Sequence, residues 1–103
     1  MKKQIKDLQL YEIDFLIAKI EKKDDAYIFH STCYIENNYI FSPTTNPLQT
    51  WPIIDRDMIS TIYIDYYTKW MAESEKCSGF GETSLEAAMR CFVASKFGDE
   101  VEL

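Results

Sequence analysis

The chain begins with a set of apolar residues that recur at helical spacing: Leu8, Tyr11, Phe15 and Ala18. Acidic residues come early in this segment and lysines come late, an order that suits the helix dipole, with Asp7 or a neighbouring residue as the candidate cap. The pair Asp24-Asp25 then breaks the pattern. The pattern predicts an N-terminal helix that ends before Asp24, preceded by residues 1–6 as a candidate disordered tail.

The clearest helical pattern lies near the other end of the chain. From Leu85 onward, apolar residues repeat three and four positions apart. Thr83 and Glu86 have the spacing of a capping box, in which the two side chains bond amides left free in the first turn. Gly98 follows at the position where a left-handed cap is easiest for glycine. These features predict a helix over Ser84–Phe97.

Between these segments, aromatic and β-branched residues replace the helical period. Residues 26–41 predict one longer strand and a returning strand, with the turn at Asn37-Asn38, because asparagine tolerates positive φ. Residues 59–66 predict a third strand, with a helix reaching Trp70 as the alternative. The prolines within residues 42–50 predict a loop, and residues 73–82 predict a polar connection.

The resulting order, α-β-β-β-α, predicts an α+β fold in which two helices pack on a small antiparallel sheet. The length of 103 residues and the apolar content of 47% suit a single domain over residues 1–103. Double-stranded-RNA-binding domains share this order. Their function is not expected here, because the last helix begins with Ser84, Leu85 and Glu86 in place of a basic cluster.

Charge is unevenly distributed along the chain, whose net charge is −6. Residues 1–23 carry six lysines and four acids, whereas residues 24–103 carry five basic residues and thirteen acids. Such a surface repels phosphate backbones, so direct nucleic-acid binding is not expected. No apolar run approaches the roughly 20 residues of a membrane span, and three cysteines suggest reduced thiols. We therefore expect a cytoplasmic protein without a membrane anchor or a cofactor.

Few residues have the chemistry of a catalytic or metal site. A strand would point His30 and Cys33 to opposite faces, which argues against a shared metal ion. Any nucleophile–base pair needs His30, the single histidine, and the sequence shows no strained nucleophile turn and no P-loop lysine. Asp55, Arg56 and Asp57 could hold a cation or a phosphate, although a solvated charged turn is more common. The sequence therefore favours no catalytic and no metal-ligating residue.

The most unusual stretch is residues 37–54, which contain no Asp, Glu, Lys or Arg in a chain with 27% charged residues. Neutral polar loops of this kind often line binding sites, and Arg56 follows as a candidate anion anchor. The competing interpretation is a partly buried hairpin followed by a proline-shaped loop that lies on the core. The predicted ligand- or partner-binding residues are Tyr39, Ser42, Thr44, Trp51, Asp55 and Arg56.

Four segments, in chain order, resemble the phage NinX family. Residues 13–19 are similar to its Leu-Asp-Trp-x-Val-Ala-Lys opening, residues 41–45 to its Tyr-Ser-Pro-Ser-Thr loop, and residues 52–56 to its Pro-Ile-Ile-Glu-Arg segment. Residues 87–101 look nearly identical to its closing block, the most specific of the four. Residues 48–51 depart from the family, which tends to have Gln-Gly-Gly there.

The resemblance implies a phage or prophage protein made inside a bacterial host, and it supplies no catalytic residue. Small phage accessory proteins commonly modify host processes or counter host defences. We therefore expect a non-enzymatic binding protein that engages a host protein or sequesters a small anionic, nucleotide-type ligand through residues 42–56. The alternatives are a small hydrolase that uses His30, Asp55 or Asp57, and a structural assembly subunit. A homo-oligomer stays open.

Overall fold

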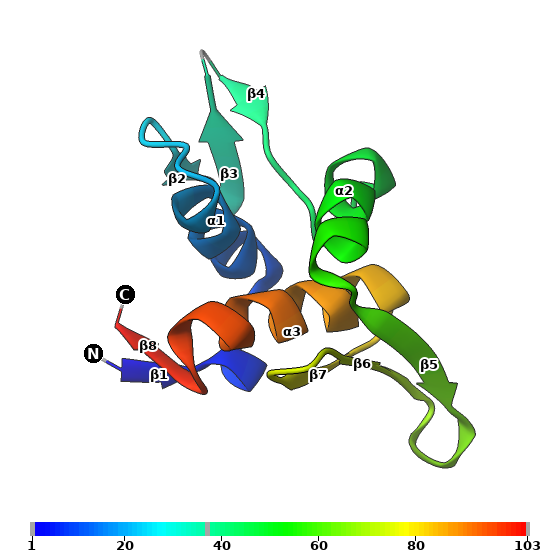
Figure 1. Cartoon of the computed structure of the whole chain (residues 1–103). Coiled ribbons are helices and arrows are strands. Elements are labelled where there is room, and N and C mark those ends of the chain that lie inside the picture. Colours follow the sequence, from blue (N-terminus) through cyan, green and yellow to red (C-terminus); the bar gives the residue numbers. More distant parts are fainter. Residues whose placement is uncertain (1, 37, 103) are drawn as a thin grey trace.

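The computed structural model describes residues 2–36 and 38–102, and its fold is α+β, as predicted (Figure 1). The helices are α1 (Leu10–Ile20), α2 (Pro47–Asp57) and α3 (Ser84–Phe97), with 3-10 turns η1 (Ile5–Asp7) and η2 (Asp65–Tyr67). The described strands pair into three antiparallel sheets: β1 (Lys2–Gln4) with β8 (Glu100–Glu102); β2 (Tyr27–Phe29), β3 (Thr32–Ile35) and β4 (Tyr39–Ile40); and β5 (Ser60–Ile64), β6 (Lys69–Glu73) and β7 (Ser78–Gly81).

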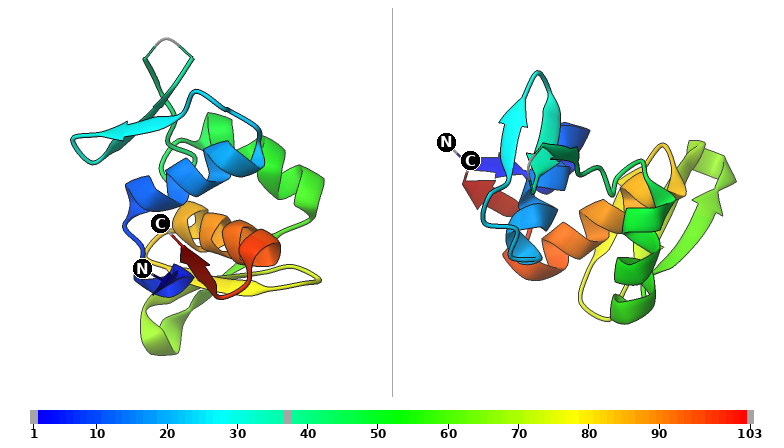
Figure 2. Two further views of the ribbon diagram at one scale, coloured as in Figure 1. Left: turned by 90° about the vertical axis from the view of Figure 1, so that its left-hand side faces the viewer. Right: turned by 90° about the horizontal axis from the view of Figure 1, so that it is seen from above.

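The last helix, α3, runs through the middle of the molecule (Figures 1 and 2). In Figure 1, α1 and α2 lie above it, and β7, β6 and the β1–β8 pair lie below it. Eight consecutive residues, 87–94, are buried, so α3 packs on all sides and not on the single stripe that the spacing predicts. The predicted bounds and the Thr83 cap are confirmed, since the Thr83 hydroxyl accepts the Glu86 amide at 3.1 Å.

Two glycines let α3 lie very close to β7. A Cβ atom built on Gly79 would come within 2.6 Å of the Cys91 amide nitrogen, and one on Gly81 within 2.7 Å of the Ala87 amide nitrogen. Both neighbours are backbone atoms, which cannot move aside as a flexible side chain does. The glycines of the predicted connection, residues 73–82, therefore belong to a strand that packs directly on the central helix.

Arg90 is a buried cation that joins α3 to the N-terminal segment. Its Nη1 donates to the Ile5 carbonyl at 2.6 Å and its Nη2 to the Leu8 carbonyl at 2.8 Å. Its guanidinium also contacts the Glu86 carboxylate at 3.3 Å, one helical turn earlier. Glu86 in turn accepts the Glu82 amide, and not the Thr83 amide that the predicted capping box would use. The positive charge of Arg90 is thus compensated by one carboxylate and two carbonyl groups.

Residues 2–20 contain more secondary structure than a tail followed by a helix. Within residues 1–6, Lys2–Gln4 form β1 against β8 and Ile5 begins η1, while Met1 lies outside the described residues. The predicted first helix is present as α1. It begins after Gln9 and not at Asp7, and the Gln9 amide donates to the Glu12 carboxylate at 2.9 Å. Its most deeply buried side chains are those of Ile13, Ile17 and Ala18.

The middle of the chain departs most from prediction. The single strand expected up to Ile35 is broken by a turn in which His30 and Ser31 have φ of 50° and 58°, the geometry of a tight hairpin. The returning strand is confirmed as β4, although Asn37 of the predicted turn lies outside the described residues. Residues 60–64 form a strand, so the alternative helix through Trp70 is wrong.

The close contact between β7 and α3 makes Gly79 intolerant of any side chain. We expect Gly79→Ala to lower the free energy of unfolding by about 3 kcal/mol, because the added methyl meets the α3 backbone. Urea denaturation followed by circular dichroism measures this. Ser78→Ala, one residue earlier and exposed, is the matched control and should change stability by less than about 0.5 kcal/mol. Equal effects of the two substitutions would contradict the packing described.

Arg90 should likewise contribute to stability through its hydrogen bonds. Arg90→Ala leaves two carbonyls without their donor and Glu86 without its cation, so we expect the free energy of unfolding to fall by about 3 kcal/mol in urea denaturation. Amide exchange at Ile5, whose N–H donates to the Asp99 carbonyl, should accelerate as well. Lys96→Ala removes an exposed cation from the same helix and should cost less than about 1 kcal/mol. Unchanged exchange at Ile5 would show that Arg90 does not hold the N-terminal segment.

Candidate functional site

The uncharged stretch of the sequence forms β4, a turn and the first two turns of α2. The Asn46 side chain caps α2 by accepting the Leu48 amide at 3.0 Å. Pro47 occupies the first helical position, where its missing N–H costs nothing. The Thr50 hydroxyl donates to the Asn46 and Pro43 carbonyls. The prediction of a loop over residues 42–50 is therefore wrong from Pro47 onward, because a proline at the first helical position suits the start of a helix.

Thr44, a predicted binding residue, is used inside the protein. It is 1% exposed, and its amide and hydroxyl donate to the two Asp14 carboxylate oxygens at 2.9 and 3.1 Å. Burial raises the pKa of Asp14 to about 6, although the two hydrogen bonds from Thr44 act in the opposite direction. This pair fixes the turn before α2 to the middle of α1.

Ser42 is also engaged by the fold. Its amide donates to Gln49 Oε1 at 2.7 Å, and its carbonyl accepts the Thr45 and Asn46 amides. The Gln49 side chain completes the link by donating to the Ile40 carbonyl at 3.2 Å. Ser42 therefore sets the path from β4 into α2, and its backbone is not free to bind a ligand.

Arg56, the predicted anion anchor, is held by two carboxylates. Its guanidinium lies 3.0 Å from Glu21, the residue that caps the end of α1, and 3.0 Å from the neighbouring Asp57. The hydrogen bond to Asp57, together with Glu21, raises the pKa of Arg56. The same guanidinium lies over the Phe92 ring of α3, 5.6 Å from its centre. An incoming anion would have to displace these carboxylates, although the side chain is half exposed.

The remaining predicted residues, Tyr39, Trp51 and Asp55, are exposed. Trp51 and Arg56 are five positions apart in α2 and so point about 140° apart, which separates the predicted aromatic and cationic parts of a nucleotide site. Trp51 and Asp55 share an outward surface with residues that were not among the predicted binding residues. This surface, called the α2 face below, consists of Leu48, Trp51, Pro52 and Asp55, and the exposed Met58 follows at the end of the helix.

The α2 face had a recognisable signal in the sequence. Asn46-Pro47 is a helix-start pair, and the spacing of Leu48, Trp51, Pro52 and Asp55 is i, i+3, i+4, i+7. Two of the side chains are large, apolar and open to solvent: Leu48 is 85% exposed and Trp51 is 55% exposed. The opposite side of α2 buries Thr50 and Ile53 against the core. The helix α2 therefore carries apolar side chains on its exposed side as well as on its buried side.

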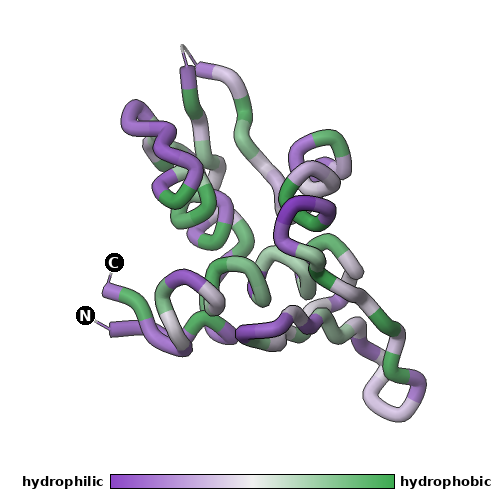
Figure 3. Tube along the Cα trace, in the orientation of Figure 1, coloured by the Kyte–Doolittle hydropathy of each residue, from purple (hydrophilic) through white to green (hydrophobic). Residues whose placement is uncertain are grey.

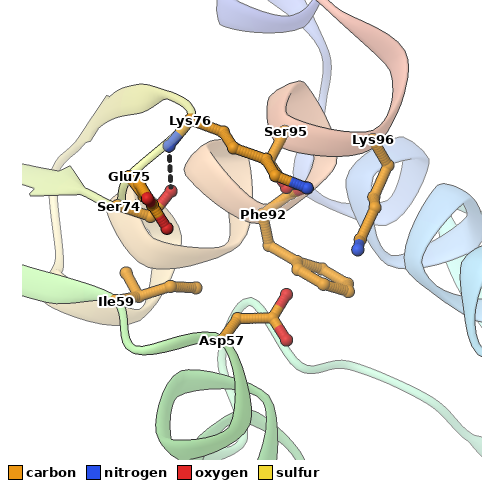
Figure 4. A pocket seen from close by; sticks show the side chains of 8 residues that line it. All are labelled: Asp57, Ile59, Ser74, Glu75, Lys76, Phe92, Ser95 and Lys96. Atoms are coloured by element: carbon orange, nitrogen blue, oxygen red, sulfur yellow. Dashed lines mark hydrogen bonds between the residues drawn. The ribbon is translucent and has the colours of Figure 1, made fainter.

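Two hollows of the described surface adjoin α2 or Phe92, and both are small. The hollow between the end of α1 and α2 has a volume of about 290 Å³, and the one beside Phe92 has about 180 Å³ (Figure 4). Both lie below the range of about 300–1,000 Å³ typical of ligand pockets. A larger hollow of about 680 Å³ adjoins β7, and its charged lining residues are three basic and three acidic: Lys6, Lys69, Arg90, Asp7, Glu82 and Glu86. This lining gives no net attraction for an anion.

The described residues contain no group of three or more His, Cys, Asp or Glu side chains that could hold a metal ion. The His30 ring packs edge-on against Phe29, with ring centres 4.1 Å apart. Among the contacts described for residues 2–36 and 38–102, none pairs that ring with a nucleophile or a carboxylate. None of the helices described is long and apolar enough to cross a membrane.

Residues 4–96 match the family model described as Bacteriophage P22, NinX. The chain belongs to this family. A comparison with curated proteins finds no match. The four NinX-like segments turn out to touch one another, since Asp14 of the first bonds Thr44 of the second, and Arg56 of the third covers Phe92 of the fourth. These segments therefore contribute to the internal framework, and the third of them also supplies Pro52 and Asp55 of the α2 face.

The Asp14–Thr44 pair makes stability depend on pH in a defined direction. The folded protein holds the Asp14 proton up to about pH 6, whereas the unfolded chain releases it near 3.8. Stability from this group is therefore greatest below pH 4 and falls as the pH rises to 6. An asparagine side chain at this position could keep both contacts to Thr44 without a charge. Between pH 4 and 7, we expect the free energy of unfolding of the natural protein to fall by on the order of 2–3 kcal/mol relative to that of Asp14→Asn.

Urea denaturation of both proteins across this pH range measures that difference. The comparison cancels the contributions of other titrating groups, because they are the same in the two proteins. Asp14→Ala is the third variant, and it should be less stable than Asp14→Asn at every pH because it cannot bond the Thr44 amide. Parallel stability curves for the natural protein and Asp14→Asn would show that the folded state does not raise the pKa of Asp14.

Proposed function

We propose that this protein is a non-enzymatic accessory factor of a phage or prophage that binds a host protein in the bacterial cytoplasm through the α2 face. The observation that carries this proposal is the exposure of Leu48, Trp51 and Pro52 side by side on a well-anchored helix. Surface apolar residues scattered singly need no explanation, whereas a contiguous group on one helix is typical of a contact surface.

The rigidity of α2 supports this use. The helix is capped by Asn46, buried through Ile53 and tied to α1 by the contact between Arg56 and Glu21. An anchored helix loses little conformational entropy when it binds, so more of the contact energy is kept as affinity. Side chains at i, i+3, i+4 and i+7 are also the usual anchors of a helix that lies in a hydrophobic groove.

Met58 extends the α2 face at an unusual backbone position. It has φ of 52° and ψ of 54°, the left-handed conformation, which costs an ordinary residue roughly 1–2 kcal/mol more than it costs glycine. Its side chain is nevertheless exposed and makes little use of the core. A methionine kept there at such a cost is consistent with a contact role, since its flexible thioether adapts to irregular partner surfaces.

The negative charge of the protein narrows the chemistry expected of its partner. Asp55 lies within the α2 face, and the chain as a whole carries −6. A partner with a hydrophobic groove bordered by basic residues would therefore be attracted to this side and fit it best. Sequestration of a nucleotide is less well supported, because Ser42, Thr44 and Arg56 already bond other groups of the protein. The hydrolase alternative has no support from the surroundings of His30.

The test is partner capture from host lysate, followed by binding of the purified partner measured by calorimetry. A photo-crosslinking residue at position 48 identifies proteins that touch the α2 face itself. We expect Trp51→Ala to weaken binding about 30-fold or more, because buried tryptophans commonly dominate interface energy. Tyr66→Ala, which removes a more exposed aromatic ring (89%) from η2, between β5 and β6, is the control and should bind normally.

A nucleotide panel in a thermal-shift assay separates the competing proposal. Binding to the folded state must raise the melting temperature, so we expect no shift at millimolar nucleotide. A shift that disappears in Arg56→Gln would favour sequestration over protein binding. If Trp51→Ala and Tyr66→Ala weaken partner binding equally, the α2 face is not the contact surface.

A further inference from the structure

The sheet β5-β6-β7 has one face against α3 and one face turned away from it. Gly79 and Gly81 point toward α3, as the positions of their missing Cβ atoms show. Because successive residues of a strand point to opposite faces, Phe80 points away. The register pairs Phe80 with Met71 and Met71 with Ile62. These three residues thus form one row across all three strands, here called the outer row.

The outer row is apolar and open to solvent. Ile62 is 54% exposed and Phe80 is 49% exposed, while Met71 between them is half buried. In Figures 1 and 2, none of the described elements covers this side of the sheet. Hydrophobic colour also continues along β5 as it extends beyond the helices (Figure 3). Exposed rows of this kind on an antiparallel sheet are typical of a surface that packs against another.

Charges border the outer row in a symmetrical way. Lys69 lies two residues before Met71 and Glu73 two residues after it, so both point to the same side as Met71. One strand therefore presents a cation, an apolar side chain and an anion in order. If β6 of a second copy faces it in the opposite direction, that strand presents the same three side chains in reverse order. Each charge then lies opposite a charge of the other sign. The face is complementary to itself.

We propose that the outer row is a homodimer interface, in which two copies of this chain pack their β5-β6-β7 sheets face to face. The two-fold axis runs along the row, so that Met71 meets Met71 of the partner subunit. Lys69 then faces Glu73 of the partner subunit, and the reciprocal pair forms on the other side of the axis. Such an interface is isologous and closes without extending into a filament.

The charges select this arrangement over the other symmetrical one. If the two-fold axis ran along β6, Lys69 would face Lys69 of the partner subunit, and Glu73 would face its own copy. Like charges placed opposite each other are unfavourable. Only the axis along the outer row gives opposite charges on both flanks.

The size of the face sets the strength of the dimer. Three strands of four or five residues cover about 14 by 17 Å, which is smaller than the roughly 800 Å² that each partner buries in a standard interface. The dimer is therefore weak and depends on concentration. Because α3 separates this sheet from α2 in Figures 1 and 2, both α2 faces stay accessible in the dimer.

Sedimentation equilibrium from about 10 μM to about 1 mM measures this association. We expect the full chain to show a reversible monomer–dimer equilibrium. Lys69→Glu and Glu73→Lys should each weaken the dimer about tenfold or more, because each places like charges opposite each other. The double variant Lys69→Glu/Glu73→Lys should restore it, since opposite charges face each other again.

Lys76→Glu is the matched control for charge. It makes the same change of two units, but its side chain lies on the α3 side of the sheet (Figure 4). It should dimerise as the natural protein does, and melting temperatures of all variants should show that they fold. A natural protein that stays monomeric at about 1 mM overturns the proposal. So does a double variant that stays as weak as the single ones, or a control that weakens equally.

Discussion

The backbone of α3 lies so close to β7 that neither Gly79 nor Gly81 could carry a side chain. This contact depends on small residues on both sides, with Ala87 and Cys91 on the helix. Once it forms, α3 is enclosed by the sheet below and by α1 and α2 above (Figure 1). A short chain can bury a central helix on all sides only if its neighbours approach closely, because few residues are available to fill gaps.

Three polar interactions then orient the elements around α3. Arg90 holds the carbonyls that end η1, Asp14 holds Thr44 ahead of α2, and Arg56 joins α2 to α1. Each joins residues more than 25 positions apart, and hydrogen bonds of this kind have strict geometry. The second of them, from Thr44 to Asp14, joins two of the NinX-like segments. These polar contacts help to hold the framework in register.

Two exposed surfaces lie on opposite sides of the central helix. The α2 face combines a tryptophan, a leucine and a carboxylate, and it suits a foreign groove. The outer row of the β5-β6-β7 sheet is flanked by one cation and one anion, and it suits a copy of itself. A weak dimer would display two α2 faces at once. Paired display raises the apparent affinity for any partner that is itself multivalent, without any new contact.

Sequence alone determined α3 and the α+β class, because helix caps and apolar spacing are local features of the chain. The closing block of the sequence was enough to indicate the family. The sequence also indicated Trp51 and Asp55 as candidate binding residues, but their helix was missed, since a proline that starts a helix resembles a proline that breaks one. What Thr44 and Arg56 contact was decided only by the tertiary structure. Their partners, Asp14 and Glu21, lie 30 and 35 residues away, and no local pattern records which side chains the fold will bring together.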